Sequence, residues 1–439
     1  MRRSHRQGRL RLRGGAALAV LALVLTACSG GSGGGSAAPG VTEDSIVIGS
    51  HQPLTGPAAP GYSNVSAGAK AYFDHVNANG GVNGRKIDFR YKDDAYNPTQ
   101  TVKVTKELVL EDKVFAMMGG LGTPTHTKVV DYLNSRRVPD LFVSSGCRCW
   151  DQPDKHPQTF GWQPDYLVEG KILGQYIKEN LAGKKVAYFY QGDDFGKDGV
   201  EGLDQYVPKE SVVSRQSYQP GGTDIAPQVT AIAQSKADVV VLFTIPTYTA
   251  LFKLTSLKLQ YNPQLVVTNV GSDPTTLAGL LQSFAKQAGG TADPAALMDG
   301  IITDTYMPPT NDASNSWIKL FRGIHDKYIP KLPFDGNVEF GMSMAYTFVQ
   351  ALQGAGKNPT RESLVKAVEK GGFTGPGLVP FRFSGDSHAG YTGVQIGILK
   401  GSTEVALQGT PLVTDSERGA ITPYTTAQPQ APADGIPAP

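Results

Sequence analysis

Four short segments of small and hydroxyl-bearing residues could bind a ligand, and each of them follows an apolar run. They are PLTGP (53–57), GGLGTPT (119–125), VSSG (143–146) and TNVGSD (268–273). Hydroxyls and free backbone N–H groups at the start of a helix favour an anion. Because GGLGTPT has no Lys or Arg, these donors suit a single carboxylate better than a phosphate cluster. Simple helix capping is the alternative for any one segment.

The residue patterns of known catalytic sites are mostly missing. The seven histidines show no HExxH spacing, and neither a GxSxG elbow nor a Walker A loop occurs. SLVK (363–366) matches SxxK but has no KTG or SDN partner and lies in a helical pattern. The acidic pairs at 93–94 and 193–194 follow apolar runs, where acidic residues commonly cap helices. The sequence favours a binding protein over an enzyme and indicates neither a cofactor nor a metal.

Apolar runs of five to seven residues alternate with amphipathic helical patterns, which predicts parallel sheets covered by helices on both faces. The alternation forms two series, separated by QPDY (163–166), and therefore indicates an α/β fold of two doubly wound lobes. A strong helical pattern follows at 337–356, and residues 380–401 alternate like an antiparallel hairpin. Ligands of doubly wound sheets bind beyond the carboxyl ends of the strands, where the four segments lie.

The N-terminus has the pattern of a secretory signal. Six arginines precede AALAVLALVL (16–25), and LTAC then ends at Cys28, which resembles the lipobox of bacterial lipoproteins. We expect residues 1–27 to be a signal peptide and residues 28–41 to be a lipidated cysteine with a flexible linker. Ordinary cleavage near Ala27 is the alternative. Without residues 1–27 the chain has 35 basic and 39 acidic residues, which argues against a nucleic-acid partner.

Two cysteines remain beyond Cys28, and both lie in GCRCW (146–150). Outside the cytoplasm Cys147 and Cys149 could form a disulfide, although a spacing of two residues is near the limit of disulfide geometry. They could also be free thiols. A metal site is the third alternative, and it has little support because no second cysteine pair or nearby histidine pattern occurs.

Longer motifs resemble the branched-chain amino acid binding proteins of ABC transporters. The shared elements are the T-G-P turn, a helix ending in NANGGVNG (77–84), and DDAYNP (93–98) before the next helix. The match continues through MMGGLGTPT (117–125) and YFYQGDDFGKDGVEGL (188–203), and it covers about residues 42 to 400.

The resemblance implies a type I periplasmic-binding-protein fold, in which two lobes joined by three crossings close on a small ligand. By position, the crossings are expected near Gln163–Pro164, Met307–Pro309 and Thr374–Gly377. Lobe 1 would then comprise 42–163 and 308–375, and lobe 2 would comprise 164–307 and 376–412. The Pro/Ala-rich end, 420–439, is expected to be disordered from its composition.

The resemblance also implies ligand contacts. In the family the first lobe holds the carboxylate, and these contacts carry over to Thr123, Ser144, Ser145 and Gly146. The chain departs from the family pattern at Arg148 and in TNVGSD, where only Asp273 lies near the expected ammonium partner. Both are therefore candidate ligand contacts. The aromatic positions that match are Phe195 and Tyr62 and, less closely, Tyr248 and Phe340.

The function implied is solute capture for an ABC importer by a monomeric lipoprotein at the outer face of the cell membrane. Its partners would be a small carboxylate-bearing ligand, most readily a branched-chain or related amino acid, and the ABC permease subunits. A ligand-sensing lipoprotein, or a binding protein for an amide or an aromatic acid, is the alternative. A secreted hydrolase is a third class, which turnover of a bound ligand would reveal.

Overall fold

The computed structural model describes residues 38–222 and 224–438. The expected signal peptide and Cys28 therefore lie outside the described residues. Within the described residues, no helix combines the length and apolar character that a membrane span requires.

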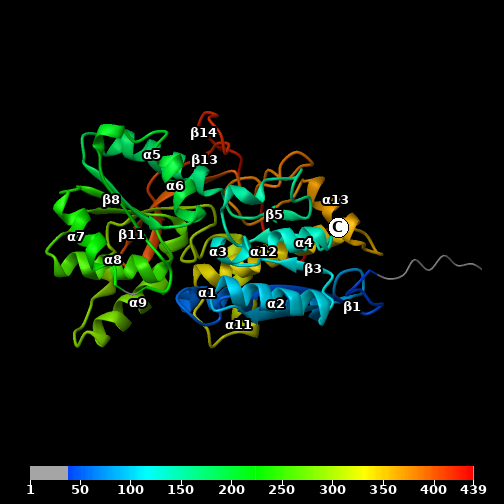
Figure 1. The fold of residues 1–439 in the computed structure, drawn as a ribbon. Helices are drawn as coiled ribbons and strands as arrows, with labels where there is room; N and C mark the ends of the chain where they lie inside the picture. The colour runs from blue at the N-terminus through cyan, green and yellow to red at the C-terminus, as the bar shows by residue number, and fades with distance from the viewer. Residues whose placement is uncertain (1–37, 223, 439) are drawn as a thin grey trace, which may run out of the picture. The chain divides into compact units, whose positions relative to one another are not determined.

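The first sheet has five parallel strands in the order β2-β1-β3-β4-β5. Figure 1 labels β1, β3 and β5 of this sheet. Apolar residues fill both of its faces, as a sheet covered by helices on both sides requires. Its strands are β1 Ser45–Gln52, β2 Lys86–Asp93, β3 Ala116–Met118, β4 Asp140–Val143 and β5 Thr159–Gly161. The helices packed with it are α1 Ala59–Ala78, α2 Pro98–Leu110, α3 Thr123–His126, α4 Val130–Ser135, α11 Ser316–Tyr328, α12 Gly336–Gly354 and α13 Arg361–Glu369. We call this part lobe 1.

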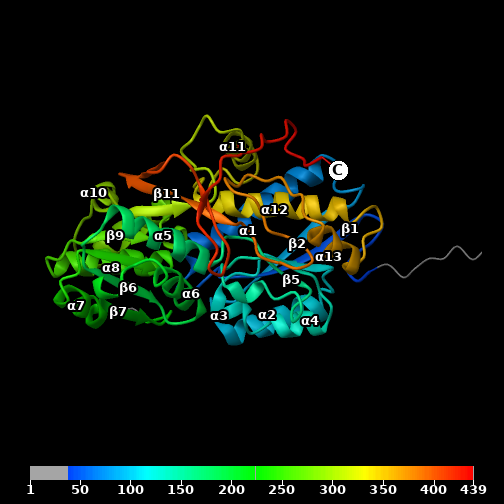
Figure 2. The ribbon, with the colours of Figure 1, turned by 90° about the horizontal axis from the view of Figure 1, so that it is seen from above.

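The second sheet is separate from the first and contains parallel strands in the order β10-β9-β8-β6-β7. Antiparallel strands extend this sheet on the far side of β10. Its strands are β6 Val186–Gln191, β7 Val212–Tyr218, β8 Val239–Phe243, β9 Gln264–Val267, β10 Ile302–Thr305, β11 Gly393–Lys400, β12 Thr403–Ala406, β13 Leu412–Val413 and β14 Thr422–Pro423. Its helices are α5 Tyr166–Asn180, α6 Asp194–Leu203, α7 Ala226–Gln234, α8 Pro246–Lys258, α9 Pro274–Gln287 and α10 Pro294–Met298. We call this part lobe 2; Figure 2 shows it from above.

Acidic and amide side chains fix where several helices begin. Asn97 accepts hydrogen bonds from Thr99 N and Gln100 N at the start of α2, and Asp193 accepts one from Phe195 N at the start of α6. Asp193 is thus a helix cap, as its position after a strand indicated. The segment after β3 forms two short helices, α3 and α4, because Val129 between them has a non-helical backbone.

An aromatic cluster lies where the chain passes between the lobes. The rings of Trp162, Tyr306 and Tyr391 are buried, with centroids 5.1 to 5.9 Å apart. Tyr391 N donates to Trp162 O at 3.0 Å, and Leu378 N donates to Tyr306 O at 2.8 Å. These contacts bring three passages of the chain together at the hinge.

The third crossing between the lobes lies later in the chain than the sequence predicted. Gly161 N, at the edge of the first sheet, donates to His388 O at 3.0 Å, and the rings of Phe160 and His388 stack at 3.7 Å. Residues up to His388 therefore belong with lobe 1, and the chain enters the second sheet after Tyr391. The expected crossing at Thr374–Gly377 was wrong because Phe381 and Phe383 pack with Phe373 in lobe 1.

The C-terminal segment was expected to be disordered over 420–439, but it is ordered in its described part, up to residue 438. β14 pairs with β13 of lobe 2, and the chain then runs back over lobe 1. There Trp317 Nε1 donates to Pro429 O at 2.6 Å, and Tyr72 Oη donates to Gly435 O at 2.7 Å. The Pro/Ala-rich composition suggested disorder, but these contacts are made by backbone carbonyls and so do not depend on the side chains of the segment. We call residues 424–438 the C-terminal strap.

Candidate functional site

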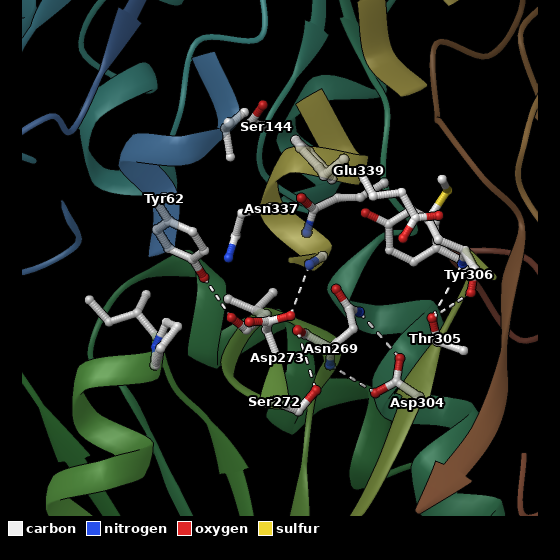
Figure 3. A pocket seen from close by; sticks show the side chains of 18 of the residues that line it. Tyr62, Ser144, Asn269, Ser272, Asp273, Asp304, Thr305, Tyr306, Asn337 and Glu339 are labelled. Atoms are coloured by element: carbon white, nitrogen blue, oxygen red, sulfur yellow. Dashed lines mark hydrogen bonds between the residues drawn. The ribbon is translucent and has the colours of Figure 1, made fainter. Parts of the chain in front are cut away.

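A cavity of about 140 Å³ lies between the lobes, next to the hinge (Figure 3). An apolar cavity of about 150 Å³ can hold a benzene molecule, so this one suits a ligand of similar size. Lobe 1 contributes Tyr62, Val65, Tyr96, Leu121, Gly122, Ser144, Gly336, Asn337, Glu339 and Phe340. Lobe 2 contributes Tyr166, Phe195, Ile245, Pro246, Asn269, Val270, Ser272, Asp273, Pro274, Asp304, Thr305 and Glu404, and Gln163 and Tyr306 to Asn311 lie on the passages between the lobes.

The lobes touch each other around this cavity. Tyr62 Oη of α1 donates to Val270 O at 2.6 Å, and Asn337 Nδ2 of α12 lies 3.1 Å from Thr276 Oγ1 of α9. Gly336 N donates to Asp273 Oδ2 at 3.0 Å. The structure is therefore a closed state, in which a ligand in the cavity would contact both lobes.

The glycines of GGLGTPT serve side-chain packing rather than an anion cradle. A Cβ at Gly120 would lie 2.6 Å from His51 Nε2 and 2.5 Å from His126 Nδ1. Gly122 has a φ of +103°, and a Cβ there would collide with the Tyr96 ring. The segment needs small residues because buried rings occupy the space beside it.

The two histidines under this segment form a buried hydrogen-bonded row. His51 Nδ1 lies 2.8 Å from Asp94, His51 Nε2 lies 2.9 Å from His126 Nδ1, and His126 Nε2 lies 2.8 Å from Asp140. Burial lowers the pKa of His51, and the hydrogen bond that Asp94 accepts from its ring opposes that change. The row supports the strand ends of lobe 1 and does not line the cavity.

The expected carboxylate contacts lie beside the cavity, and a tyrosine covers them. Thr123 Oγ1 and Ser145 Oγ are 2.7 Å apart and buried. Tyr166 faces them from the start of α5: burial raises the pKa of its hydroxyl to about 12, and hydrogen bonds with Gly146, Ser145 and Thr123 oppose that rise. Tyr166 thus lies next to hydroxyls that the sequence assigned to a ligand carboxylate.

The predicted ligand contacts therefore separate into two groups. Tyr62, Ser144, Phe195, Asp273 and Phe340 line the cavity. Thr123, Ser145, Gly146, Arg148 and Tyr248 do not.

Gly146 and Tyr248 have structural roles. A Cβ at Gly146 would meet the backbone of Pro164 and the Tyr166 ring, so this glycine permits the close approach of the first passage. Tyr248 Oη accepts from Gly221 N at 2.7 Å and donates to Gly222 O at 2.8 Å. It holds a loop of lobe 2 and stacks on Tyr218, away from the cavity.

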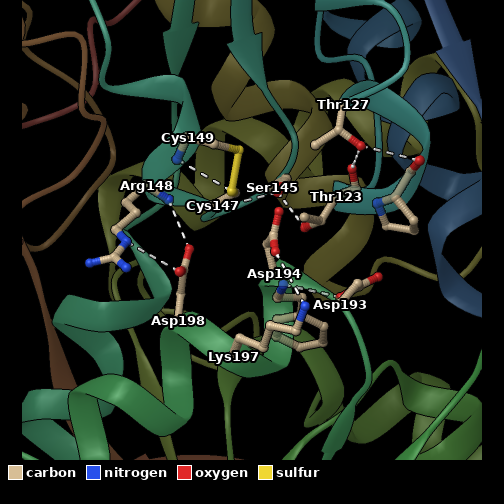
Figure 4. The surroundings of a disulfide bond; sticks show 12 residues. Thr123, Thr127, Ser145, Cys147, Arg148, Cys149, Asp193, Asp194, Lys197 and Asp198 are labelled. Carbon is tan, nitrogen blue, oxygen red and sulfur yellow. Dashed lines mark hydrogen bonds and ion pairs between the residues drawn. A yellow bond between two sulfur atoms is a disulfide. The ribbon is translucent and has the colours of Figure 1, made fainter.

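Arg148 joins the lobes from outside the cavity (Figure 4). Its Nε lies 3.3 Å from Asp198 Oδ1, and its guanidinium makes two hydrogen bonds to Glu201, at 2.6 and 3.0 Å. Cys147 and Cys149 form a disulfide on either side of it, which settles the cysteine alternatives for this structure. Arg148 does not line the cavity, and α6 of lobe 2 supplies its partners.

Asp273 lines the cavity but is already bonded. Its carboxylate caps α9 by accepting from Thr276 N at 2.7 Å, and it also accepts from Gly336 N of lobe 1. The sequence placed it near an ammonium group, and the structure allows that contact only in addition to these two.

Three carboxyl groups that the sequence did not single out also line the cavity: Asp304, Glu339 and Glu404. Asp304 faces the buried Glu169 of α5, and Asn269 bridges them by donating to both carboxyls. Burial raises the pKa of Asp304 to about 6, and it raises that of Glu169 further, with the charge of Asp304 adding to the rise.

Glu339 and Glu404 lie on opposite sides of the hinge. Burial raises the pKa of Glu339, and Glu404 and Asp273 add to the rise. Burial likewise raises the pKa of Glu404 to about 8. An acidic residue inside an otherwise apolar helix, NVEFGMSMAYTF (337–348), was the available sequence signal for Glu339.

Known proteins share this architecture. Residues 45–402 match the periplasmic binding protein family. A Leu/Ile/Val-binding protein homologue of Brucella melitensis is 27% identical over 212 residues, which is 44% of this chain and 53% of that protein. An amino acid binding protein of Pseudomonas aeruginosa is 28% identical over 44% of this chain and 52% of its own length. The chain thus aligns with about half the length of these curated relatives.

Solved structures agree over most of the fold. A fatty acid ABC transporter substrate-binding protein from Thermomonospora curvata has a TM-score of 0.74 at 23% identity, covering 87% of this chain and 95% of its own. A branched-chain amino acid ABC transporter protein from Thermus thermophilus with bound valine has a TM-score of 0.72 at 19% identity, covering 88% and 98%. With the family match over residues 45–402, these findings show that the chain belongs to the periplasmic binding protein family, whose members bind substrates and are not enzymes.

Proposed function

We propose that this protein captures a small amino compound between its lobes and delivers it to an ABC importer at the outer face of the cell membrane. The observation that carries the proposal is the cavity between the lobes, which is lined by both and sized for a small molecule. The names of the relatives suggest an amino acid, and a branched-chain amino acid is the first candidate to test.

Closure on a ligand has a measurable thermodynamic consequence. A ligand that binds only the folded state stabilises it by RT ln(1 + [L]/Kd), which is about 2.7 kcal/mol at a hundredfold excess over Kd. We expect a cognate amino compound to raise the melting temperature of the purified protein and to reduce its radius of gyration in solution scattering. Chemical conversion of the ligand during such an experiment would contradict a binding role.

The transport role needs a cellular test. Deleting the gene should abolish uptake of the solute that the purified protein binds, and restoring the gene should recover it. If uptake is unchanged, the protein senses its ligand rather than feeding a transporter.

The proposed anchor is a diacylglycerol group on Cys28, which lies outside the described residues. Its support is the sequence pattern that ends in LTAC (25–28) after a basic start and an apolar run. Mass spectrometry of the mature N-terminus should find a lipid-modified Cys28. An unmodified N-terminus at or beyond Ser29 would exclude the anchor.

A further inference from the structure

The charged side chains that line the cavity are all acidic. Four of the lining residues carry carboxyl groups, and none of the lining residues within 38–222 and 224–438 is Lys, Arg or His. The four are Asp273, Asp304, Glu339 and Glu404. A ligand anion would enter this cavity without a cationic partner, and burying an unpaired charge is strongly unfavourable.

One of these carboxyls points to a missing partner. Glu339 is only 3% exposed, and its Oε1 has no hydrogen-bond partner among the residues that the structure describes. Figure 3 shows its side chain at the cavity. Because buried polar atoms are almost always hydrogen-bonded, a donor on a ligand is the natural complement of this oxygen.

Aromatic rings surround the same space. Tyr62, Tyr166, Tyr306, Phe195 and Phe340 all line the cavity. The faces of such rings attract cations, and the attraction strengthens when water is excluded. Rings and carboxyls together favour a positively charged group with an apolar body.

An organic cation suits the cavity better than a metal ion. In the described part of the chain, no group of three or more His, Cys, Asp or Glu side chains is arranged to hold a metal ion. The carboxyls instead lie on separate elements, since Asp304 is on β10, Glu339 on α12 and Glu404 on β12.

Of the expected carboxylate contacts, only Ser144 lines the cavity. The hydroxyls of Thr123 and Ser145 bond to each other, and that of Tyr166 covers them. Two of the hydroxyls expected to recognise the carboxylate of an amino acid are therefore bonded within the protein, whereas four carboxyl groups line the cavity.

We propose that the cavity recognises its ligand through an ammonium group, that it needs no carboxylate, and that the cognate solute is a small organic amine. This inference rests on the proposed capture function and specifies the class of solute. The cavity volume suits an amine of about six heavy atoms, the size of benzene.

The test compares ligands that share a carbon skeleton. Leucine, 3-methylbutylamine and 4-methylpentanoate differ only in whether they carry the ammonium, the carboxylate or both. Benzylamine and benzoate form a second pair with an aromatic body. Titration calorimetry of the purified protein should show that each amine binds at least about tenfold more tightly than its matched acid, and that 3-methylbutylamine binds at least as tightly as leucine.

A charge-removing variant locates the recognition. Glu339→Gln keeps the size of the side chain and should weaken amine binding by about tenfold or more. The matched control is Glu362→Gln, because Glu362 is an exposed carboxylate of α13, outside the cavity, and should leave affinity unchanged. Melting temperature and circular dichroism establish that both variants fold.

The outcomes separate the inference from the function on which it rests. The inference would be overturned if the acids bound more tightly than the amines, or if leucine were the only ligand that bound. Solute capture would remain in place in both cases. Amine binding that is unaffected by Glu339→Gln in a folded protein would also overturn it. If no amine, amino acid or acid binds or changes the scattering radius, the proposed function fails as well.

Discussion

Arg148 Nε of lobe 1 lies 3.3 Å from Asp198 Oδ1 of lobe 2. Asp198 also accepts a hydrogen bond from the Arg148 backbone N–H at 3.2 Å, so one carboxylate holds both the main chain and the side chain of the arginine. Burial raises the pKa of Asp198 to about 6, and the hydrogen bond and charge of Arg148 oppose that rise. The contact exists only while the lobes are closed, so its strength affects the balance between open and closed states.

The first prediction concerns this arginine. Arg148→Met should weaken ligand binding only severalfold, because the side chain is 43% exposed and ion pairs of that kind contribute about 0.2–1 kcal/mol. It should also increase the scattering radius of the unliganded protein. Arg90→Met is the matched control, since Arg90 pairs with Asp88 and Asp112 within lobe 1 at a similar exposure. Complete loss of binding in Arg148→Met would restore the arginine as a ligand contact.

The second prediction concerns the disulfide. The Cys147–Cys149 bond encloses Arg148 and thereby restrains the turn that presents it to α6. Replacing both cysteines by serine should reproduce part of the effect of Arg148→Met, and the combined variant should lose less affinity than the sum of the two, because both changes act on one contact. Calorimetry on the four proteins measures the coupling. Full additivity would show that the disulfide acts independently of the arginine.

The third prediction concerns Tyr166. Tyr166→Phe keeps the ring that packs against Phe195 with a centroid separation of 4.5 Å, but it removes the hydroxyl that covers Thr123 and Ser145. The two exposed hydroxyls should then accept a carboxylate, so leucine should gain affinity relative to 3-methylbutylamine. A parallel measurement with Tyr176→Phe, on the same helix but outside the cavity, should show no change. An unchanged ratio in Tyr166→Phe would mean that these hydroxyls never reach the ligand.

The fourth prediction concerns acidity. Burial raises the pKa of Asp165 and Asp335 to about 7, that of Asp304 to about 6 and that of Glu404 to about 8. A raised pKa in the folded state means that the native protein binds more protons than the unfolded chain from about pH 4 upward. The protonated carboxyls therefore contribute fully to the stability of the folded protein below about pH 4, and this contribution is lost as the pH rises through their folded-state pKa values of about 6 to 8.

The buried histidine His51 has the opposite effect on stability at low pH. The lowered pKa of His51 favours unfolding below about pH 6.5, where the unfolded chain takes up a proton that the native state does not. Since the raised carboxyls outnumber such histidines, we expect the melting temperature of the unliganded protein to increase from pH 8 to pH 5. A saturating amine should flatten the profile, because it favours ionised carboxylates. A melting temperature that falls steadily towards pH 5 would contradict the assignment.

The sequence predicted the fold well because its evidence is local. Apolar runs followed by helical spacing mark β1, β6 and β8 and the helices after them, and each segment can be interpreted from a few neighbouring residues. The sequence did not indicate β10, because ITDT (302–305) has one apolar residue followed by three polar ones and lacks a clear apolar run. Asp304, the carboxyl that it contributes to the cavity, was missed with it.

The candidate site was harder to predict because its contacts join distant parts of the chain. The partners of Arg148 lie some fifty residues away, on the opposite lobe, and no local pattern reveals that they face it. The same holds for Tyr166, which comes from the second lobe to cover hydroxyls of the first. Tyr62 and Phe195 could be named in advance because they match aromatic positions of the family that the sequence resembles.

The C-terminal strap sets a geometric limit on how far the lobes can separate at its position. It leaves lobe 2 at Pro423 and is held by lobe 1 at Gln428, whose side chain accepts from Asn315 at 2.8 Å. Five residues of fully extended chain reach no more than about 18 Å. Any wider opening there must first detach the strap from one lobe, so the maximum travel of the lobes is determined by chain length and not by the hinge alone.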